Sequence, residues 1–248
     1  MTADPTTRPL LDPAELAAEA RSILACPGSV SLVVDGHPSV LGDDALGMQD
    51  VYGTPTFSCP PDSELAVAAA HHRSALITVE SGLGHPGSEE RAMTLTLAGR
   101  VETRGVEDCA CCAETRHVVV LELNFALLTR HAAPAAGDER EPDQQLRVPL
   151  AHFRSPAHHL NRGYLQHSVE HANSCHQEEL RRAVSTTTGT PMGRLLGVAL
   201  ADLSPSGVQV RWIDAEGARH LDVTFPRAAR TTAELGEMLR RELHAGIC

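Results

Sequence analysis

The segment EHANSCHQEEL, residues 170–180, places two histidines and a cysteine, His171, His176 and Cys175, in one short polar run. Imidazole nitrogen and thiolate sulfur are protein ligands for metal ions such as zinc, so metal chemistry is the first hypothesis. Residues four apart share one face of an α-helix, whereas residues five apart lie about 140° apart around its axis. On one continuous helix, His171 and Cys175 could share an ion, and His171 and His176 are not expected to do so.

Two further groups of ligand types carry weaker signals. His167 and His171 form an H-x-x-x-H pair, a zinc half-site, but the glutamate that a metalloprotease needs after the first histidine is missing and no third ligand is evident. A fortuitous helical pair is therefore preferred. The cluster DCACC holds Cys109, Cys111 and Cys112 without the C-x-x-C spacing of a zinc hairpin, so we interpret it as a loop. The alternative is a thiol set that binds a metal or forms a redox-sensitive disulfide.

Composition excludes several partners. The chain of 248 residues has 32 acidic and 21 basic residues and a net charge of -11, with no basic stripe, which argues against nucleic acid. It has no apolar stretch approaching the roughly 20 residues that span a bilayer, and its start lacks the pattern of a secretory signal. Seven cysteines do not suit a disulfide framework. These features predict a cytoplasmic protein that binds no membrane.

The elements that would position these residues fall into two blocks. Residues 1–12 are expected to be a disordered tail, and residues 12–24 a helix with Asp12 as its N-cap and Pro13 as its first residue. Short runs rich in Val, Leu and Thr follow, with one helix near residues 62–72. Met93, Leu95 and Leu97 alternate with threonines, which indicates a strand with one buried face. The expected strands are 29–34, 54–59, 74–80, 92–103, 117–129 and 146–150, with a loop over 131–145.

The second block is predicted to be a compact α/β unit. Residues 155–163 form the expected linker between a barrel domain at 13–154 and a C-terminal domain at 164–248. The elements of that second domain are expected to be one long helix over 164–184, strands over 194–203, 207–214 and 218–225, and a closing helix over 229–243. The fold class is therefore predicted to be α+β, with a closely spaced antiparallel barrel or sandwich followed by a helix, three strands and a helix.

The order of these elements resembles a known family. PGSVSLVV, SELAVAAAHHRSALITVE and RAMTLTLAGRVE are similar to the flavin-binding split barrel of the pyridoxamine-phosphate-oxidase superfamily. EHANSCHQEEL and HLDVTFPRAARTTAELGEML are similar to the domain of unknown function number 2470, which closes haem-utilisation proteins of the HugZ type. The resemblance extends over about residues 13–245. It implies a haem-binding protein with a split barrel, which pairs as a homodimer through that barrel.

The resemblance also implies site residues. The family motif is Glu-His-Met-Asn-x-Asp-His, and Glu170, His171, Asn173 and His176 match it, while Ala172 and Cys175 depart from it. The second histidine of the motif is an axial haem ligand in some members, so His176 is the expected iron ligand, braced by His171 and Asn173.

A second set of haem-binding candidates comes from the predicted strand RHLDVTF. Haem needs an axial ligand, an apolar slot and cations for its propionates. His220 in this strand could supply the ligand, and Arg219 and Arg227 nearby could meet the propionates.

These residues leave three functions open. The preferred one is non-catalytic haem binding, in storage, sensing or delivery, and the second is oxidative haem degradation by a haem-degrading oxygenase. The third is an oxidoreductase that binds flavin mononucleotide (FMN), which needs cations and hydroxyls at the phosphate. The barrel offers few such groups, Arg73, Ser74 and Arg91, so FMN is the alternative.

Overall fold

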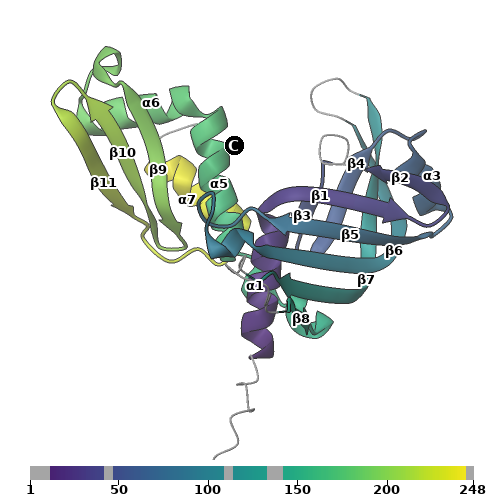
Figure 1. The fold of residues 1–248 in the computed structure, drawn as a ribbon. Coiled ribbons are helices and arrows are strands. Elements are labelled where there is room, and N and C mark those ends of the chain that lie inside the picture. Colours follow the sequence, from purple (N-terminus) through teal and green to yellow (C-terminus); the bar gives the residue numbers. More distant parts are fainter. Residues whose placement is uncertain (1–11, 42–46, 109–113, 133–141, 244–248) are drawn as a thin grey trace, which may run out of the picture. The chain divides into compact units, whose positions relative to one another are not determined.

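The computed structural model describes residues 12–41, 47–108, 114–132 and 142–243, which form two compact units that divide between His158 and His159 (Figure 1). The predicted fold class is confirmed: an α+β chain in which a curled antiparallel sheet of the split-barrel type precedes a three-stranded antiparallel sheet with helices. No helix in the described ranges is both long and apolar enough to cross a membrane.

The first unit is built on an eight-stranded sheet whose order is β2-β1-β5-β6-β7-β4-β3, with β8 paired to β7. All of these pairs are antiparallel. The elements are α1 (Pro13–Ala25), β1 (Pro27–Val34), β2 (His37–Leu41), β3 (Gln49–Val51), β4 (Thr54–Cys59), α3 (Glu64–Ala70), β5 (Ser74–Ser81), η1 (Glu89–Arg91), β6 (Met93–Asp108), β7 (Thr115–Arg130), β8 (Gln144–Arg147), α4 (Leu150–Phe153) and η2 (Pro156–His158).

Alternation along β6 fixes the core face of this sheet. Met93, Leu95 and Leu97 are buried while the threonines between them are half-buried, as the sequence predicts. The expected strand over 146–150 is partly wrong, because β8 ends at Arg147 and Pro149 caps α4 instead. Proline has no N–H to donate to a sheet, so pairing ends before it.

Helix α1 begins as the sequence predicts. The Asp12 carboxylate accepts a hydrogen bond from the Ala14 N–H at 2.9 Å, and Pro13 is the first helical residue. This cap satisfies one of the free N–H groups of the first turn. The apolar side of α1, which includes Leu16, Ala20 and Leu24, is buried in the core of the first unit.

A buried arginine on α1 ties this helix to two other segments. Arg21 is 1% exposed; its Nη2 donates to Asp50 Oδ2 at 2.9 Å and its Nη1 donates to the Phe153 carbonyl at 3.0 Å. Asp50 also accepts from the Gly53 N–H at 2.6 Å. Gly53 has φ +88°, and a Cβ there would lie 2.8 Å from Arg21 Nη1, so the turn needs glycine. Ion pairing and hydrogen bonds thus allow a charge to be buried here.

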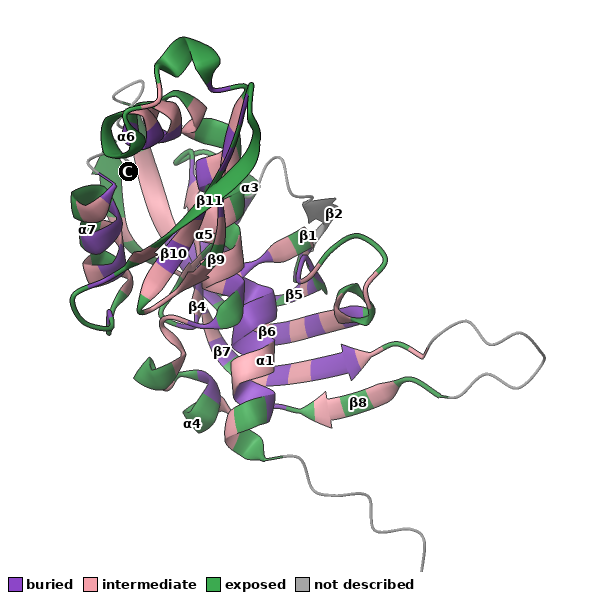
Figure 2. Cartoon of the chain, turned by 90° about the vertical axis from the view of Figure 1, so that its left-hand side faces the viewer, coloured by how far each residue is buried: buried purple, intermediate pink, exposed green. Residues whose placement is uncertain are grey.

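The second unit has a three-stranded sheet in the order β11-β10-β9. Val208, Val210 and Trp212 on one face of β10 are buried with the apolar residues of the helices, and β11 is exposed over almost its whole length (Figure 2). The elements are α5 (Arg162–Cys175), α6 (Gln177–Thr188), η3 (Met192–Arg194), β9 (Gly197–Ser204), β10 (Gly207–Asp214), β11 (Gly217–Thr224) and α7 (Thr232–Glu242).

The prediction of one continuous helix over 164–184 is wrong in one respect. It is interrupted at His176, which ends α5 with φ −120° and ψ 32°, outside the helical region, and α6 starts at the next residue. The turn keeps two helical hydrogen bonds, from the His176 N–H to the Ala172 carbonyl and from the Leu180 N–H to the His176 carbonyl, both at 3.0 Å. The interruption is therefore a local twist between two helices.

Candidate functional site

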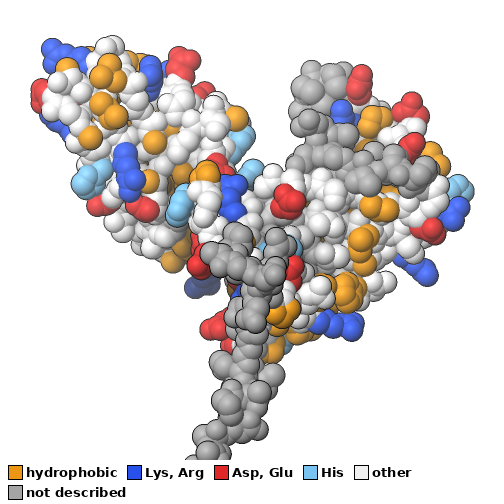
Figure 3. Space-filling view, viewed as in Figure 1, with side chains coloured by type: hydrophobic (Ala, Val, Ile, Leu, Met, Phe, Trp, Pro, Cys, Tyr) orange, Lys and Arg blue, Asp and Glu red, His pale blue; other side chains and the backbone are white. Residues whose placement is uncertain are grey.

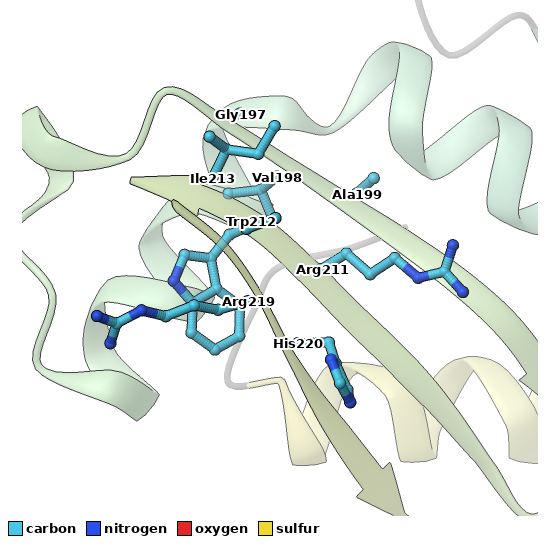
Figure 4. A pocket seen from close by; sticks show the side chains of 9 residues that line it. Gly197, Val198, Ala199, Arg211, Trp212, Ile213, Arg219 and His220 are labelled. Carbon is cyan, nitrogen blue, oxygen red and sulfur yellow. The ribbon is translucent and has the colours of Figure 1, made fainter. Parts of the chain in front are cut away.

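A cavity of about 440 Å³ opens on the three-stranded sheet (Figure 4). Because side chains alternate along a strand, one set of lining residues shares the face opposite the buried Val208 and Val210. Small residues on β9 leave space over that face. The residues of this set are Gly197 and Ala199 on β9, Arg211 and Ile213 on β10, and Ala218 and His220 on β11. The cavity is also lined by Val198, Trp212 and Arg219.

An imidazole and a guanidinium face the solvent side by side in this cavity. His220 and Arg211 are directly opposite each other on β11 and β10, and both are exposed. Arg211 Nη2 donates to Asp202 Oδ2 at 2.8 Å, and its Nε donates to Gln209 Oε1. These partners orient the guanidinium without burying it. The site therefore offers one ring nitrogen donor and one positive charge on the same surface.

The rest of the cavity lining is mostly apolar. Ile213, on the same face as Arg211, is 51% exposed. Trp212, 7% exposed, lines the cavity and has a buried ring N–H without a hydrogen-bond partner among the described residues. Exposed apolar side chains gathered around a hollow are typical of a binding surface.

Arg219 and Arg227, the arginines of the predicted site, also have carboxylate partners. Arg219 lines the cavity and pairs with Asp214, at 3.5 Å from Nε to Oδ2, and with Glu216. Arg227 does not line it; its guanidinium makes two hydrogen bonds, 3.1 and 3.2 Å long, to the Glu234 carboxylate. Hydrogen bonding to Glu234 raises the pKa of Arg227, and the same bond lowers the pKa of Glu234.

The structure brings His171 and His176 together. Their Nε2 atoms are 3.3 Å apart, and the ring centroids are 5.1 Å apart at an interplanar angle of 72°. The expectation that these histidines lie on separate faces is therefore wrong. It assumed one continuous helix, and the twist at His176 turns the second ring towards the first.

Asn173, expected to brace a haem ligand, makes contacts with the sheet instead. Its amide Nδ2 donates to the Leu200 carbonyl at 2.9 Å, and its Oδ1 accepts from the Leu200 N–H at 2.7 Å. Gln177, on the other side of the interruption, donates to the Val198 carbonyl at 3.0 Å and to the Asn173 carbonyl at 2.7 Å. The two amides thus pair with β9 much as a neighbouring strand would, a role that sequence reasoning missed.

The cysteines divide into buried and exposed sets. Cys26 and Cys59 are buried packing residues, as expected, and Cys175 is exposed. Cys109, Cys111 and Cys112 lie outside the described residues. Within the ranges that the structure describes, no three His, Cys, Asp or Glu side chains are grouped so that they could hold a metal ion.

A second hollow, of about 380 Å³, lies in the first unit. It is lined by Glu19, Glu89, Glu90 and Arg130 among others, and Arg130 is paired with Glu19 at 2.5 Å. Three carboxylates around one neutralised arginine repel a phosphate group.

Basic and acidic side chains are interspersed on the face of the molecule shown in Figure 3.

Comparison with known proteins gives fold-level likeness. Neither a family model nor a curated protein matches the chain. A haem-binding protein from Mycobacterium smegmatis is 16% identical over 96% of this chain and 98% of its own, with a TM-score of 0.40. A protein of unknown function from Agrobacterium tumefaciens is 18% identical over 96% and 100%, with a TM-score of 0.40. A candidate general stress protein 26 from Jannaschia is 13% identical over 54% and 98%, with a TM-score of 0.38. These values are too low to transfer a ligand or an activity.

Proposed function

We propose that this protein binds haem on the exposed face of the three-stranded sheet, with His220 as the axial ligand. The observation that carries the proposal is the cavity in which His220 and Arg211 stand opposite each other beside an apolar surface. Haem needs an axial donor, an apolar slot and cations for its propionates, and this face supplies all three types of group. The volume of about 440 Å³ lies within the range of small-molecule sites.

The apolar side chains favour an occupant of this kind. Ile213 lines the cavity and is 51% exposed, and covering it with an apolar macrocycle removes that surface from solvent. Arg211 lines the cavity and is exposed, and a propionate would share its guanidinium with Asp202, which already accepts from Nη2 at 2.8 Å. The haem supplies the iron chemistry, whereas the protein's own residues hold and orient it.

His176, the ligand implied by the family motif, stays a prediction with less geometric support. Two imidazoles on opposite sides of one metal have nitrogens about 4 Å apart, twice a bond of about 2.0–2.1 Å. The Nε2 atoms of His171 and His176 are 3.3 Å apart, so the pair as it stands does not match that arrangement. The distance therefore disfavours a haem held by both rings, and His176 as a single ligand does not line the cavity that contains His220.

No observation favours FMN. The hollow in the first unit carries carboxylates, and Arg91 donates to the Gly84 carbonyl at 3.4 Å. Storage, sensing or delivery of haem is preferred to oxidative degradation, as the sequence suggests. Dimerisation through the barrel and a cytoplasmic location also remain predictions; sedimentation velocity would test the first.

A haemin titration tests the proposal. The wild-type protein should shift the Soret band of haemin and quench the emission of Trp212, the chain's one tryptophan. His220→Ala should abolish the Soret shift, while His176→Ala and His152→Ala should leave it unchanged; His152 is an exposed histidine of the other unit. Arg211→Ala should weaken binding by up to about fivefold, since an exposed ion pair contributes up to about 1 kcal/mol.

The possible results separate the hypotheses. A wild-type protein that leaves the spectrum of haemin unaltered would refute haem binding. A His220→Ala variant that binds haemin normally would refute His220 as the ligand. Loss of the Soret shift in His176→Ala would support His176, the ligand that the family motif implies. Decay of the Soret band on adding ascorbate would identify a degrading enzyme, whereas a stable band would favour a carrier or sensor.

A further inference from the structure

Two imidazole nitrogens lie close together at the junction of α5 and α6. His171 is exposed on the last turn of α5, His176 is half-buried at its end, and their Nε2 atoms are 3.3 Å apart. Neither residue lines the cavity that holds His220. The pair is thus a separate feature of the second unit.

The separation of these nitrogens fits a shared metal ion. For bonds of about 2.0–2.1 Å, two ligands at a tetrahedral angle are about 3.3–3.4 Å apart, and two ligands at a right angle are about 2.9 Å apart. The observed 3.3 Å matches the tetrahedral value. The same separation is within hydrogen-bonding range, so without an ion one ring can donate to the other.

The fold holds the backbone on both sides of the histidine pair in place before any ion binds. Asn173 follows His171 by two residues and makes two hydrogen bonds to Leu200; Gln177 directly follows His176 and hydrogen-bonds Val198. Both sides of the helix interruption are therefore attached to the same strand, β9. A site that is already formed loses less conformational entropy on binding than one that must be assembled.

We propose that His171 and His176 form a binding site for a divalent transition-metal ion, with Zn²⁺ as the best match. Imidazole suits Zn²⁺, Cu²⁺ and Ni²⁺, and the tetrahedral span favours Zn²⁺ among them. Two protein ligands leave the remaining positions to water, since the described residues offer no third His, Cys, Asp or Glu. The site is therefore open and exchangeable, unlike a closed structural zinc site.

Calorimetric titration with Zn²⁺ tests this proposal. The protein is used without an affinity tag, stripped with a chelator, and alkylated so that thiols, those of Cys175 and residues 109–112 included, do not bind the ion. His171→Ala and His176→Asn should each weaken the binding of one Zn²⁺ at least about tenfold, because each removes one of two ligands. Asparagine is used at position 176 because it suits a helix end, and Trp212 emission verifies folding.

His167→Ala is the matched control. His167 is exposed and lies four residues before His171 on α5, where it would form the alternative H-x-x-x-H pair. Its replacement should leave Zn²⁺ affinity unchanged. Equal affinity in wild type, His171→Ala and His176→Asn would overturn the proposal, as would loss of binding in His167→Ala with retention in His176→Asn. Haem binding through His220 is unaffected by either result.

Discussion

Replacing Asn173 with alanine separates a structural role from a ligand role for this residue. The change removes two hydrogen bonds to the backbone of Leu200, of 2.9 and 2.7 Å. Each neutral hydrogen bond contributes about 0.5–1.5 kcal/mol net, so the free energy of unfolding should fall by about 1–3 kcal/mol. Haemin affinity should not change, because the amide is already engaged with the strand.

Urea unfolding followed by tryptophan emission measures this loss. Trp212 is the chain's one tryptophan and is buried in the second unit, so its emission reports the unit that contains the mutation. With an m-value of about 2 kcal/mol/M, a loss of 2 kcal/mol lowers the midpoint by about 1 M. Asn173→Asp keeps the acceptor for the Leu200 N–H and loses the donor, so it should be destabilised too.

Ser174→Ala, at the exposed neighbouring position on the same helix, is the control. It should change stability by less than about 0.5 kcal/mol. The reasoning would be refuted by an Asn173→Ala protein that unfolds at the wild-type urea concentration and fails to bind haemin. That result would indicate that Asn173 acts at the haem site, as the family motif implies, and not as a structural residue.

Three further outcomes are expected. Asp50→Asn should destabilise the first unit by about 3–5 kcal/mol in calorimetry, because it leaves the buried Arg21 without its counter-charge. Gly99→Ala should cost about 3 kcal/mol in the same assay, since a Cβ there would lie 2.0 Å from a backbone carbonyl oxygen of β7. The pKa of Glu234 is lowered by Arg227, so their pairing stabilises the fold above the ordinary value of 4.5 and is lost as pH falls through the lowered pKa. Glu234→Gln should therefore flatten the acid side of a plot of stability against pH, and an unaltered profile would contradict this assignment.

Local patterns predicted most of the elements. Asp12 and Pro13 determine where α1 begins, and the alternation of Met93, Leu95 and Leu97 identifies the buried face of β6. Strands β2 and β3 were missed, because they have only 5 and 3 residues and no alternation that stands out from a loop.

The helix interruption could not be predicted. The segment HANSCHQEEL has neither glycine nor proline, so nothing in it signals a break. Its cause is tertiary, because Asn173 and Gln177 bind β9 from both sides of His176. Asparagine is less favourable inside a helix because its amide competes for nearby backbone groups, but this preference does not locate a break.

The candidate haem site was predicted in part. Alternation along RHLDVTF places His220 on one face of its strand, and the structure adds that Arg211 is its neighbour. That pairing depends on the register between two strands, which a single sequence does not encode locally. Arg227 was expected nearby and instead pairs with Glu234.

The amides of Asn173 and Gln177 also limit how the second unit can assemble. They occupy backbone groups along β9, so within the described residues the open edge of this sheet is β11. An open edge can add a strand from another molecule. If two copies pair through β11 about a twofold axis, each copy uses up its open edge. The opposite edge, β9, then faces outwards and is already covered by the two amides. Edge-to-edge growth would then stop at two copies and not continue into a fibre.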